Sequence, residues 1–112
     1  MKVQIKNTAR GVELVTLQGD LDFHSSPELR EKFIELADHQ ASKILVDFKK
    51  VDYVDSSGLA AFVELFQRMK RYNGQLVLFN LSEGVRDIFE IAKLHSIFRL
   101  AQSEQEAMSL LS

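Results

Sequence analysis

The chain has 112 residues, of which 46% are apolar and 27% are charged, and 14 Lys and Arg against 16 Asp and Glu give a net charge of -2. This composition is typical of one soluble domain that buries an ordinary core. The absence of cysteine excludes disulfides, thiol nucleophiles and thiolate metal sites. The charge balance argues against direct nucleic-acid binding, and no apolar run is long enough for membrane insertion. We therefore expect a cytoplasmic protein.

The first third of the chain predicts a hairpin followed by a helix. Apolar and polar residues alternate over residues 3–6, turn residues fill 7–11, and a β-branched run covers 12–17, which is typical of two paired strands. Residues 25–28 (Ser-Ser-Pro-Glu) predict a helix start, with a serine cap and proline at the first helical position. The apolar face of that helix comprises Leu29, Phe33, Leu36 and Ala37.

The rest of the chain alternates strands with helices. Residues 43–48 form a strongly apolar strand, a helix is expected from about Ser57 to Tyr72, and residues 76–79 give the next strand. Ser82 predicts the cap of a further helix, and residues 97–100 a last short strand. Ser103 with Glu106 predicts a capping box for a terminal helix. The expected apolar stripes of these helices comprise Leu59, Phe62, Val63, Phe66, Met69, Val85, Ile88, Phe89, Ala107, Leu110 and Leu111.

This order predicts the α/β class. Strands that alternate with helices require right-handed crossovers and a largely parallel sheet. We expect a single domain over residues 1–112, with a mixed, mostly parallel sheet of four to five strands, an N-terminal hairpin and about four flanking helices.

Two segments follow predicted strands at their carboxyl ends, the usual functional edge of an open α/β sheet. One runs from Gly19 to His24. The other runs from Val51 to Leu59 and puts two serines and a glycine at the start of a helix. The free amides and dipole of that helix would stabilise a phosphate on Ser56 or Ser57. The residues leave a second interpretation open, in which Asp55 or a serine is only the N-cap and Gly58 is a loop residue.

Catalysis by Ser56 is a weaker interpretation. The nucleophile elbow of a hydrolase has glycine two residues before and two residues after the serine, whereas Ser56 has Gly58 after it but Val54 before it. His95 is the only histidine on a later loop that could serve as the base.

The remaining polar clusters also favour structural roles, and we expect neither metal nor cofactor. A basic cluster at residues 68–72 fits the last turn of a helix better than an RNA site. Paired metal-ligand spacing is absent from the histidines, and the loop aspartates form no ordered oxygen-ligand loop. These residues are His24, His39, His95, Asp20, Asp22, Asp52 and Asp55.

The run Val54-Asp55-Ser56-Ser57-Gly58-Leu59, preceded by Gly19-Asp20-Leu21-Asp22, resembles the STAS-domain anti-sigma factor antagonists of bacteria. The resemblance covers essentially the full chain, including the element order and the Asn73-Gly74 turn before a strand. The chain departs from the family at Ala60, where glycine is often seen, and at Val54, where methionine is often seen. Neither position is the phosphate acceptor of the family.

The resemblance implies a phosphorylation switch. In this family an anti-sigma factor that is itself a serine kinase modifies the serine after the aspartate, which corresponds to Ser56, with Ser57 as the less favoured candidate. The unphosphorylated antagonist binds the anti-sigma factor and releases the sigma factor, and a PP2C-type phosphatase resets the cycle. The implied partner surface comprises Asp22, Asp55, Ser56, Ser57, Gly58 and Leu59. A non-enzymatic monomer or weak dimer is expected.

Two alternatives come from other classes. The chain could be a STAS scaffold or subunit of a larger assembly, such as a stressosome-like particle or a lipid-transport complex, without a phosphorylation cycle. It could also be a small serine hydrolase that acts through Ser56.

Overall fold

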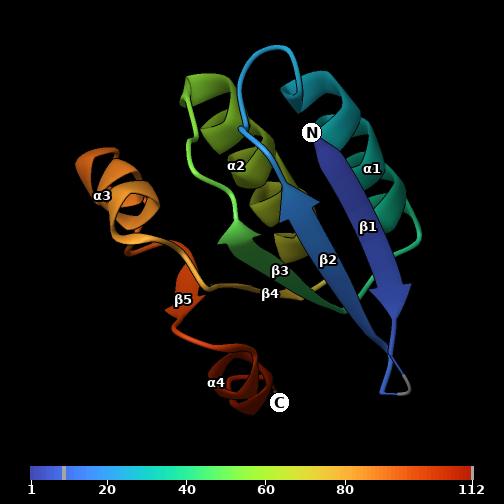
Figure 1. The fold of residues 1–112 in the computed structure, drawn as a ribbon. Helices are drawn as coiled ribbons and strands as arrows, with labels where there is room; N and C mark the ends of the chain where they lie inside the picture. Colours follow the sequence, from blue (N-terminus) through green and yellow to red (C-terminus); the bar gives the residue numbers. More distant parts are fainter. Residues whose placement is uncertain (9, 112) are drawn as a thin grey trace.

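A five-stranded sheet in the order β1-β2-β3-β4-β5 organises the molecule (Figure 1). The computed structural model describes residues 1–8 and 10–111. Strands β1 (Lys2–Asn7) and β2 (Val12–Gln18) pair antiparallel, as the predicted hairpin requires. The other strands join in parallel, namely β3 (Lys43–Lys50), β4 (Gln75–Phe79) and β5 (Arg99–Ala101). Four helices flank them: α1 (Ser26–Asp38), α2 (Ser56–Lys70), α3 (Glu83–Ile91) and α4 (Glu104–Ser109).

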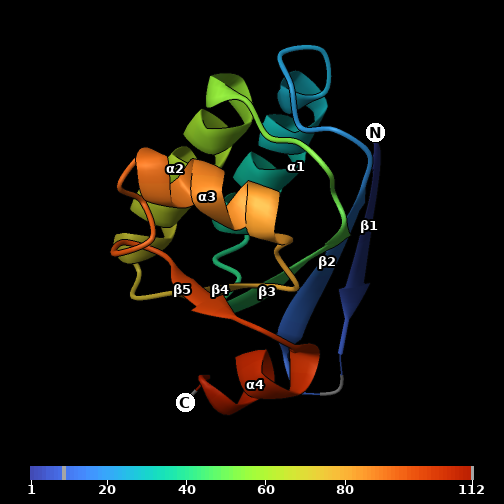
Figure 2. The same ribbon diagram turned by 60° about the vertical axis from the view of Figure 1, so that its left-hand side comes forward.

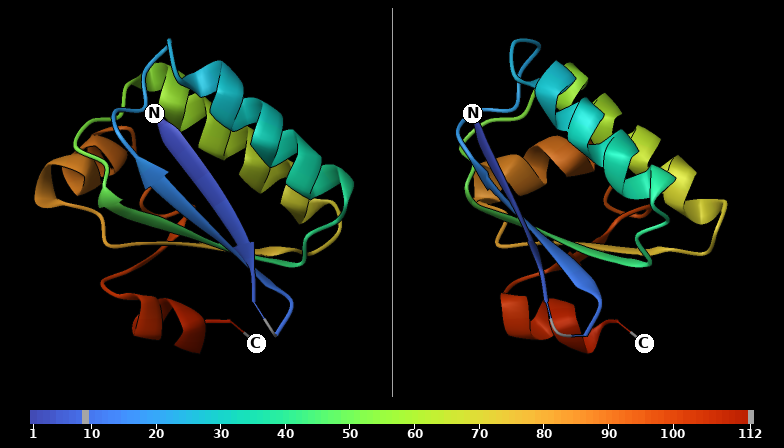
Figure 3. Two further views of the ribbon diagram at one scale, coloured as in Figure 1. Left: turned by 45° about the vertical axis from the view of Figure 1, so that its right-hand side comes forward. Right: turned by 90° about the vertical axis from the view of Figure 1, so that its right-hand side faces the viewer.

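The helices are divided unequally between the two faces of the sheet. Helices α1, α2 and α3 cover one face, whereas α4 lies against the other (Figures 2 and 3). The larger core lies under the three helices and contains a chain of phenyl rings, in which Phe62 lies 5.1 Å from Phe33 and 5.2 Å from Phe48 between ring centroids. The predicted mixed sheet, hairpin and four helices are confirmed.

The prediction for the start of α1 is partly wrong. Ser25 occupies the N-cap position, but its side chain accepts no hydrogen bond from the helix. Its hydroxyl instead donates to the Asp20 carbonyl at 2.8 Å and accepts from the Asp22 amide at 3.0 Å. The hydroxyl is therefore committed to the preceding loop, and Pro27 is the second helical residue, because Ser26 is the first.

Several other boundaries also differ from the prediction. Helix α2 begins at Ser56 and ends at Lys70, and α4 ends before Leu110. Strand β5 begins at Arg99 because residues 97 and 98 form a turn, in which both amides donate to the Leu94 carbonyl at 3.0 Å. The turn places the Phe98 ring 5.7 Å from the rings of two helical phenylalanines. Tertiary packing therefore decides where the last strand begins.

The loops after β2 and β3 lie side by side at one end of the sheet (Figure 1). Parallel pairing continues beyond the strands through a bridge between Leu21 and Val54. The Leu21 amide donates to the Tyr53 carbonyl and the Asp55 amide donates to the Leu21 carbonyl, each at 2.9 Å. Because Leu21 and Val54 are also buried, the two loops form one rigid unit just before α2 begins.

Candidate functional site

Helix α2 begins at an aspartate cap. Oδ1 of Asp55 accepts hydrogen bonds from the amides of Ser57 at 2.8 Å and Gly58 at 3.1 Å. The Asp55 carbonyl accepts the first helical bond, from the amide of Leu59 at 3.0 Å. Of the three residues that could have been the N-cap, Asp55 is therefore the one that caps, and both serine hydroxyls are left out of this role.

The two serines have different surroundings. Ser56 is the first helical residue and is exposed, and its hydroxyl makes no hydrogen bond within the part of the chain that the structure describes. Ser57 is half-buried and lines a hollow of about 220 Å³ between α1 and α2, together with Pro27 and Arg30. A macromolecule can therefore reach the Ser56 hydroxyl more easily than the Ser57 hydroxyl.

Gly58 is a packing residue of the helix. A Cβ at this position would lie 2.9 Å from both Cβ and the carbonyl oxygen of Leu21, and 3.0 Å from a methyl group of Val54. The interpretation of Gly58 as a loop residue is wrong, because the residue is helical and buried. The group that approaches its backbone closely is Leu21 of the neighbouring loop.

The carboxylate of Asp22 fixes the loop after β2. Its Oδ1 accepts from the amides of His24 at 2.9 Å and Ser25 at 3.1 Å. The hydrogen bond from the Ser25 amide is the main reason that the pKa of Asp22 lies below its usual value, and the His24 amide acts in the same direction. Beside Asp22 is an open hollow of about 310 Å³, whose lining residues are Met1, Asp20, Asp22, His24, Ser25 and Glu28.

The Leu21–Val54 bridge brings most of the predicted site residues to one edge. Asp22 lies on one of the joined loops, and Asp55 and Ser56 lie on the other. Leu59 is half-buried and packs against the larger core, so little of it faces a partner. Sequence reasoning missed Phe23 and Tyr53, two exposed aromatic residues on these loops, although an aromatic ring inside a polar loop is a readable signal.

The described residues do not show the serine–base arrangement that the hydrolase interpretation requires. A nucleophilic serine needs a general base within hydrogen-bonding reach, and within residues 1–8 and 10–111 no histidine bonds to the Ser56 hydroxyl. His39 approaches the Glu35 carbonyl at 2.9 Å, and His24 stacks against Phe23. Across the same residues, no three His, Asp or Glu side chains are grouped so that they could hold a metal ion.

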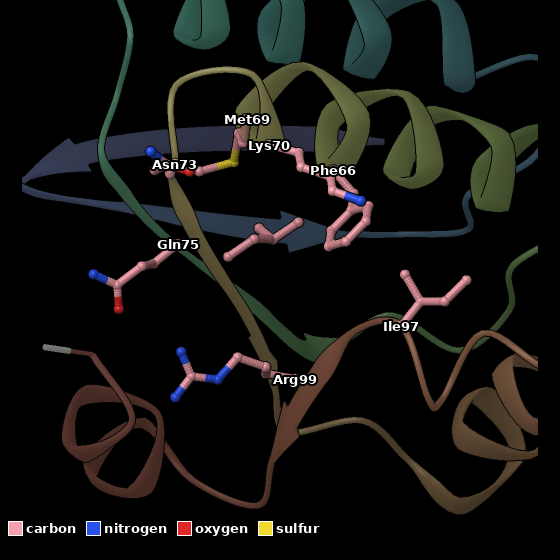
Figure 4. A pocket seen from close by; sticks show the side chains of 9 residues that line it. Phe66, Met69, Lys70, Asn73, Gln75, Ile97 and Arg99 are labelled. Atoms are coloured by element: carbon pink, nitrogen blue, oxygen red, sulfur yellow. The ribbon is translucent and has the colours of Figure 1, made fainter.

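The basic cluster at residues 68–72 belongs to the opposite end of α2. Arg68 pairs with Glu64 at 3.6 Å, and the Tyr72 hydroxyl donates to the Ala41 carbonyl at 2.9 Å. Figure 4 shows a hollow of about 300 Å³ beside this end, between α2, β4 and β5. Its lining residues are Phe66, Met69, Lys70, Asn73, Gly74, Gln75, Leu76, Ile97 and Arg99. It shares no residue with the predicted site.

A protein-family model of the STAS domain matches residues 4–107. The chain belongs to the STAS domain family. None of the helices within the described residues has the length and apolar character to cross a membrane.

Several curated relatives of this STAS domain are named anti-sigma factor antagonists. The anti-sigma-B factor antagonist of Bacillus subtilis is 34% identical over 105 residues, which cover 94% of each chain. The solved structure of the anti-sigma factor antagonist SpoIIAA in its unphosphorylated form matches with a TM-score of 0.76 at 23% identity, over 96% of each chain. SpoIIAA of Bacillus in its phosphorylated form matches with a TM-score of 0.75 at 25% identity, over 96% of this STAS domain and 97% of that chain.

Proposed function

We propose that this chain is an anti-sigma factor antagonist that is switched by phosphorylation of Ser56. Its unphosphorylated form binds an anti-sigma factor that is also a serine kinase, and this binding releases a sigma factor in the bacterial cytoplasm. Transfer of one phosphate to the Ser56 hydroxyl ends the binding, and a PP2C-type phosphatase restores it. The chain acts as a regulatory binding protein and not as an enzyme.

The exposure of Ser56 is the observation that carries this proposal. The Ser56 hydroxyl is free of internal hydrogen bonds within the described residues, while the cap of α2 is supplied by Asp55. A kinase can therefore phosphorylate the Ser56 hydroxyl without breaking the hydrogen bonds that cap α2. A phosphate at the first helical position is also favoured by the helix dipole, so the modified chain keeps its fold.

Charge explains how one phosphate could end binding. Phosphoserine adds about 1.5 to 2 negative charges at pH 7. A pair of like unit charges about 4 Å apart at an effective dielectric constant of about 20 costs about 4 kcal/mol. The nucleotide phosphate that a kinase holds against the Ser56 hydroxyl supplies such a like charge on the partner. Even a third of that value weakens association about tenfold, so repulsion and a blocked contact suffice without refolding.

Replacement of each serine separately tests the proposal. The reagents are the purified anti-sigma factor kinase of the source bacterium and labelled ATP. We expect that Ser56→Ala binds the kinase but accepts no phosphate, and that Ser56→Asp fails to bind. Ser57→Ala is the matched control and should be labelled stoichiometrically, with intact mass as the readout.

The outcomes separate the candidate functions. Stoichiometric phosphate on the Ser56→Ala protein would contradict the assignment and move the acceptor to Ser57. A wild-type chain that binds no kinase and purifies instead within a large particle or with a transporter ATPase would favour the scaffold alternative. Ester hydrolysis that disappears in Ser56→Ala would favour the hydrolase.

A further inference from the structure

Two large aromatic side chains are exposed on the loops that carry the proposed site. Phe23 is 64% exposed and Tyr53 is 49% exposed, whereas the other exposed large apolar residues of the described chain are isoleucines. Single exposed apolar residues are ordinary on a protein surface. These two aromatic rings, in contrast, lie on two loops that are joined to each other, so we expect a partner to cover them.

Both rings are carried by the loops that adjoin Ser56. Tyr53 precedes Ser56 by three residues, so their Cα atoms are at most about 11 Å apart. The Tyr53 carbonyl accepts the amide of Leu21 at 2.9 Å, and Phe23 follows Leu21 by two residues. A standard interface covers about 800 Å² on each partner, equivalent to a disc with a radius of about 16 Å. An interface of that size, centred on Ser56, is wide enough to reach both loops.

The loops that carry the rings are ordered before any partner arrives. The Phe23 ring packs on the ring of His24, with 4.1 Å between centroids. The Asp22 carboxylate accepts two amides of the same loop, and the Leu21–Val54 bridge fixes the loop that carries Tyr53. Side chains and loops that are already ordered lose little conformational entropy on binding.

The charges around the rings indicate the chemistry of the partner face. Asp20 and Asp52 are exposed on the same two loops, and Asp55 lies half-buried beside Ser56. Complementary potentials favour association, so the facing surface should carry Lys or Arg around apolar sockets.

We propose that Phe23 and Tyr53 are the apolar anchors of the kinase interface, each filling a socket edged by cationic side chains of the anti-sigma factor. Aromatic residues dominate the few positions that carry most of the binding energy in interfaces. This inference rests on the proposed function, because it takes the kinase that acts on Ser56 as the partner.

Alanine substitution of each ring tests the inference. The probe is the purified kinase that phosphorylates the wild-type chain, with Mg·ADP in place of ATP so that Ser56 stays unmodified during titration. We expect Phe23→Ala and Tyr53→Ala each to raise Kd at least tenfold. Tyr53→Phe keeps the ring and should stay within about threefold of wild type. Ile91→Ala is the matched control, because Ile91 is 82% exposed but lies on α3.

Phosphorylation kinetics supply a second readout. Both alanine variants should raise KM for the chain with little change in kcat, because the acceptor hydroxyl is untouched. The inference is overturned if both variants bind the kinase within twofold of wild type while their thermal unfolding is unchanged. A wild-type chain that no kinase binds overturns the proposed function instead, so the two failures are distinguishable.

Discussion

The two ends of helix α2 are built from similar parts but present different surfaces. Each end has a glycine packed tightly, Gly58 against Leu21 and Gly74 against Met69 and Tyr72. At the N-terminal end the Asp55 carboxylate satisfies the free amides and leaves the Ser56 hydroxyl exposed.

At the C-terminal end, Arg68 pairs with Glu64 and the Tyr72 hydroxyl is bonded within the chain. The last turn carries Arg68 and Lys70, which complement the helix dipole. The Tyr72 hydroxyl is bonded to the Ala41 carbonyl, and burial raises the pKa of this hydroxyl. The comparison shows that the start of α2 leaves a serine hydroxyl exposed, whereas its end is packed against Ala41 and Glu64.

The largest expected difference between the two ends concerns their glycines. Gly58→Ala should destabilise the fold by about 1–3 kcal/mol, because the added methyl group meets the backbone carbonyl of Leu21. Gly74→Ala should cost less than Gly58→Ala, because the added methyl group meets side chains of Met69 at 2.9 Å and Tyr72 at 3.0 Å and no backbone atom. Urea denaturation with constant m-value measures both.

A third glycine is the control for this pair. A Cβ at Gly84, in α3, would meet nothing within 4 Å. Gly84→Ala should therefore stabilise the protein by about 0.5–1 kcal/mol through helix propensity. If Gly58→Ala proves as stable as Gly84→Ala, the close contact between α2 and the Leu21 loop is contradicted.

Substitution of the N-cap residues of α2 and α3 should give the next largest change in the free energy of unfolding. Asp55→Ala removes the acceptor of two amides and should cost about 1–2 kcal/mol. Ser82→Ala, which removes the acceptor of the Val85 amide alone, should cost about 1 kcal/mol or less. Asp55→Asn keeps an oxygen in place and should lose only a few tenths of a kcal/mol. Equal stability of Asp55→Ala and wild type would show that the cap is not needed to start α2.

Local signals predicted the fold well. The alternation around residues 3–17 and the serine caps at Ser82 and Ser103 are properties of adjacent residues, and the structure confirms each of them. Ser25 looked like an equal cap, but its hydroxyl is bonded within the preceding loop. The start of the last strand depends on where Phe98 packs. Both features depend on tertiary packing, which cannot be predicted from the local pattern of a single sequence.

The surroundings of the candidate site residues could be predicted only in part. The Asp55-to-Gly58 run marked the correct helix start. The separate surroundings of Ser56 and Ser57 depend on α1, and the close contact of Gly58 depends on Leu21, which is 37 positions away in the chain. The exposure of Phe23 and Tyr53 likewise follows from how two distant loops are joined. The roles of these residues toward a partner stay predictions.

The smallest expected effect on stability is electrostatic and concerns Glu64, which lies between the two ends of α2. Glu64 pairs with Arg30 of α1 and with Arg68. The hydrogen bond from Arg30 is the main reason that the pKa of Glu64 lies below its usual value of 4.5, and burial partly opposes it. A lowered pKa in the folded state means that the pair stabilises the fold above pH 4.5, and that this contribution disappears as the pH falls through the lowered value.

Substitution of Glu64 measures this contribution. The Arg30 side chain is 58% exposed, so water screens the pair and Glu64→Gln should cost less than about 1 kcal/mol at pH 7. Urea midpoints from pH 7 to pH 3 should show the variant and wild type converging, and high salt should reduce the difference at pH 7. Glu31→Gln, on the exposed surface of α1, should show no such convergence. A difference that grows toward low pH would mean that Glu64 is stabilised in its protonated form, and that the α1–α2 contact near Ser57 does not depend on the ion pair.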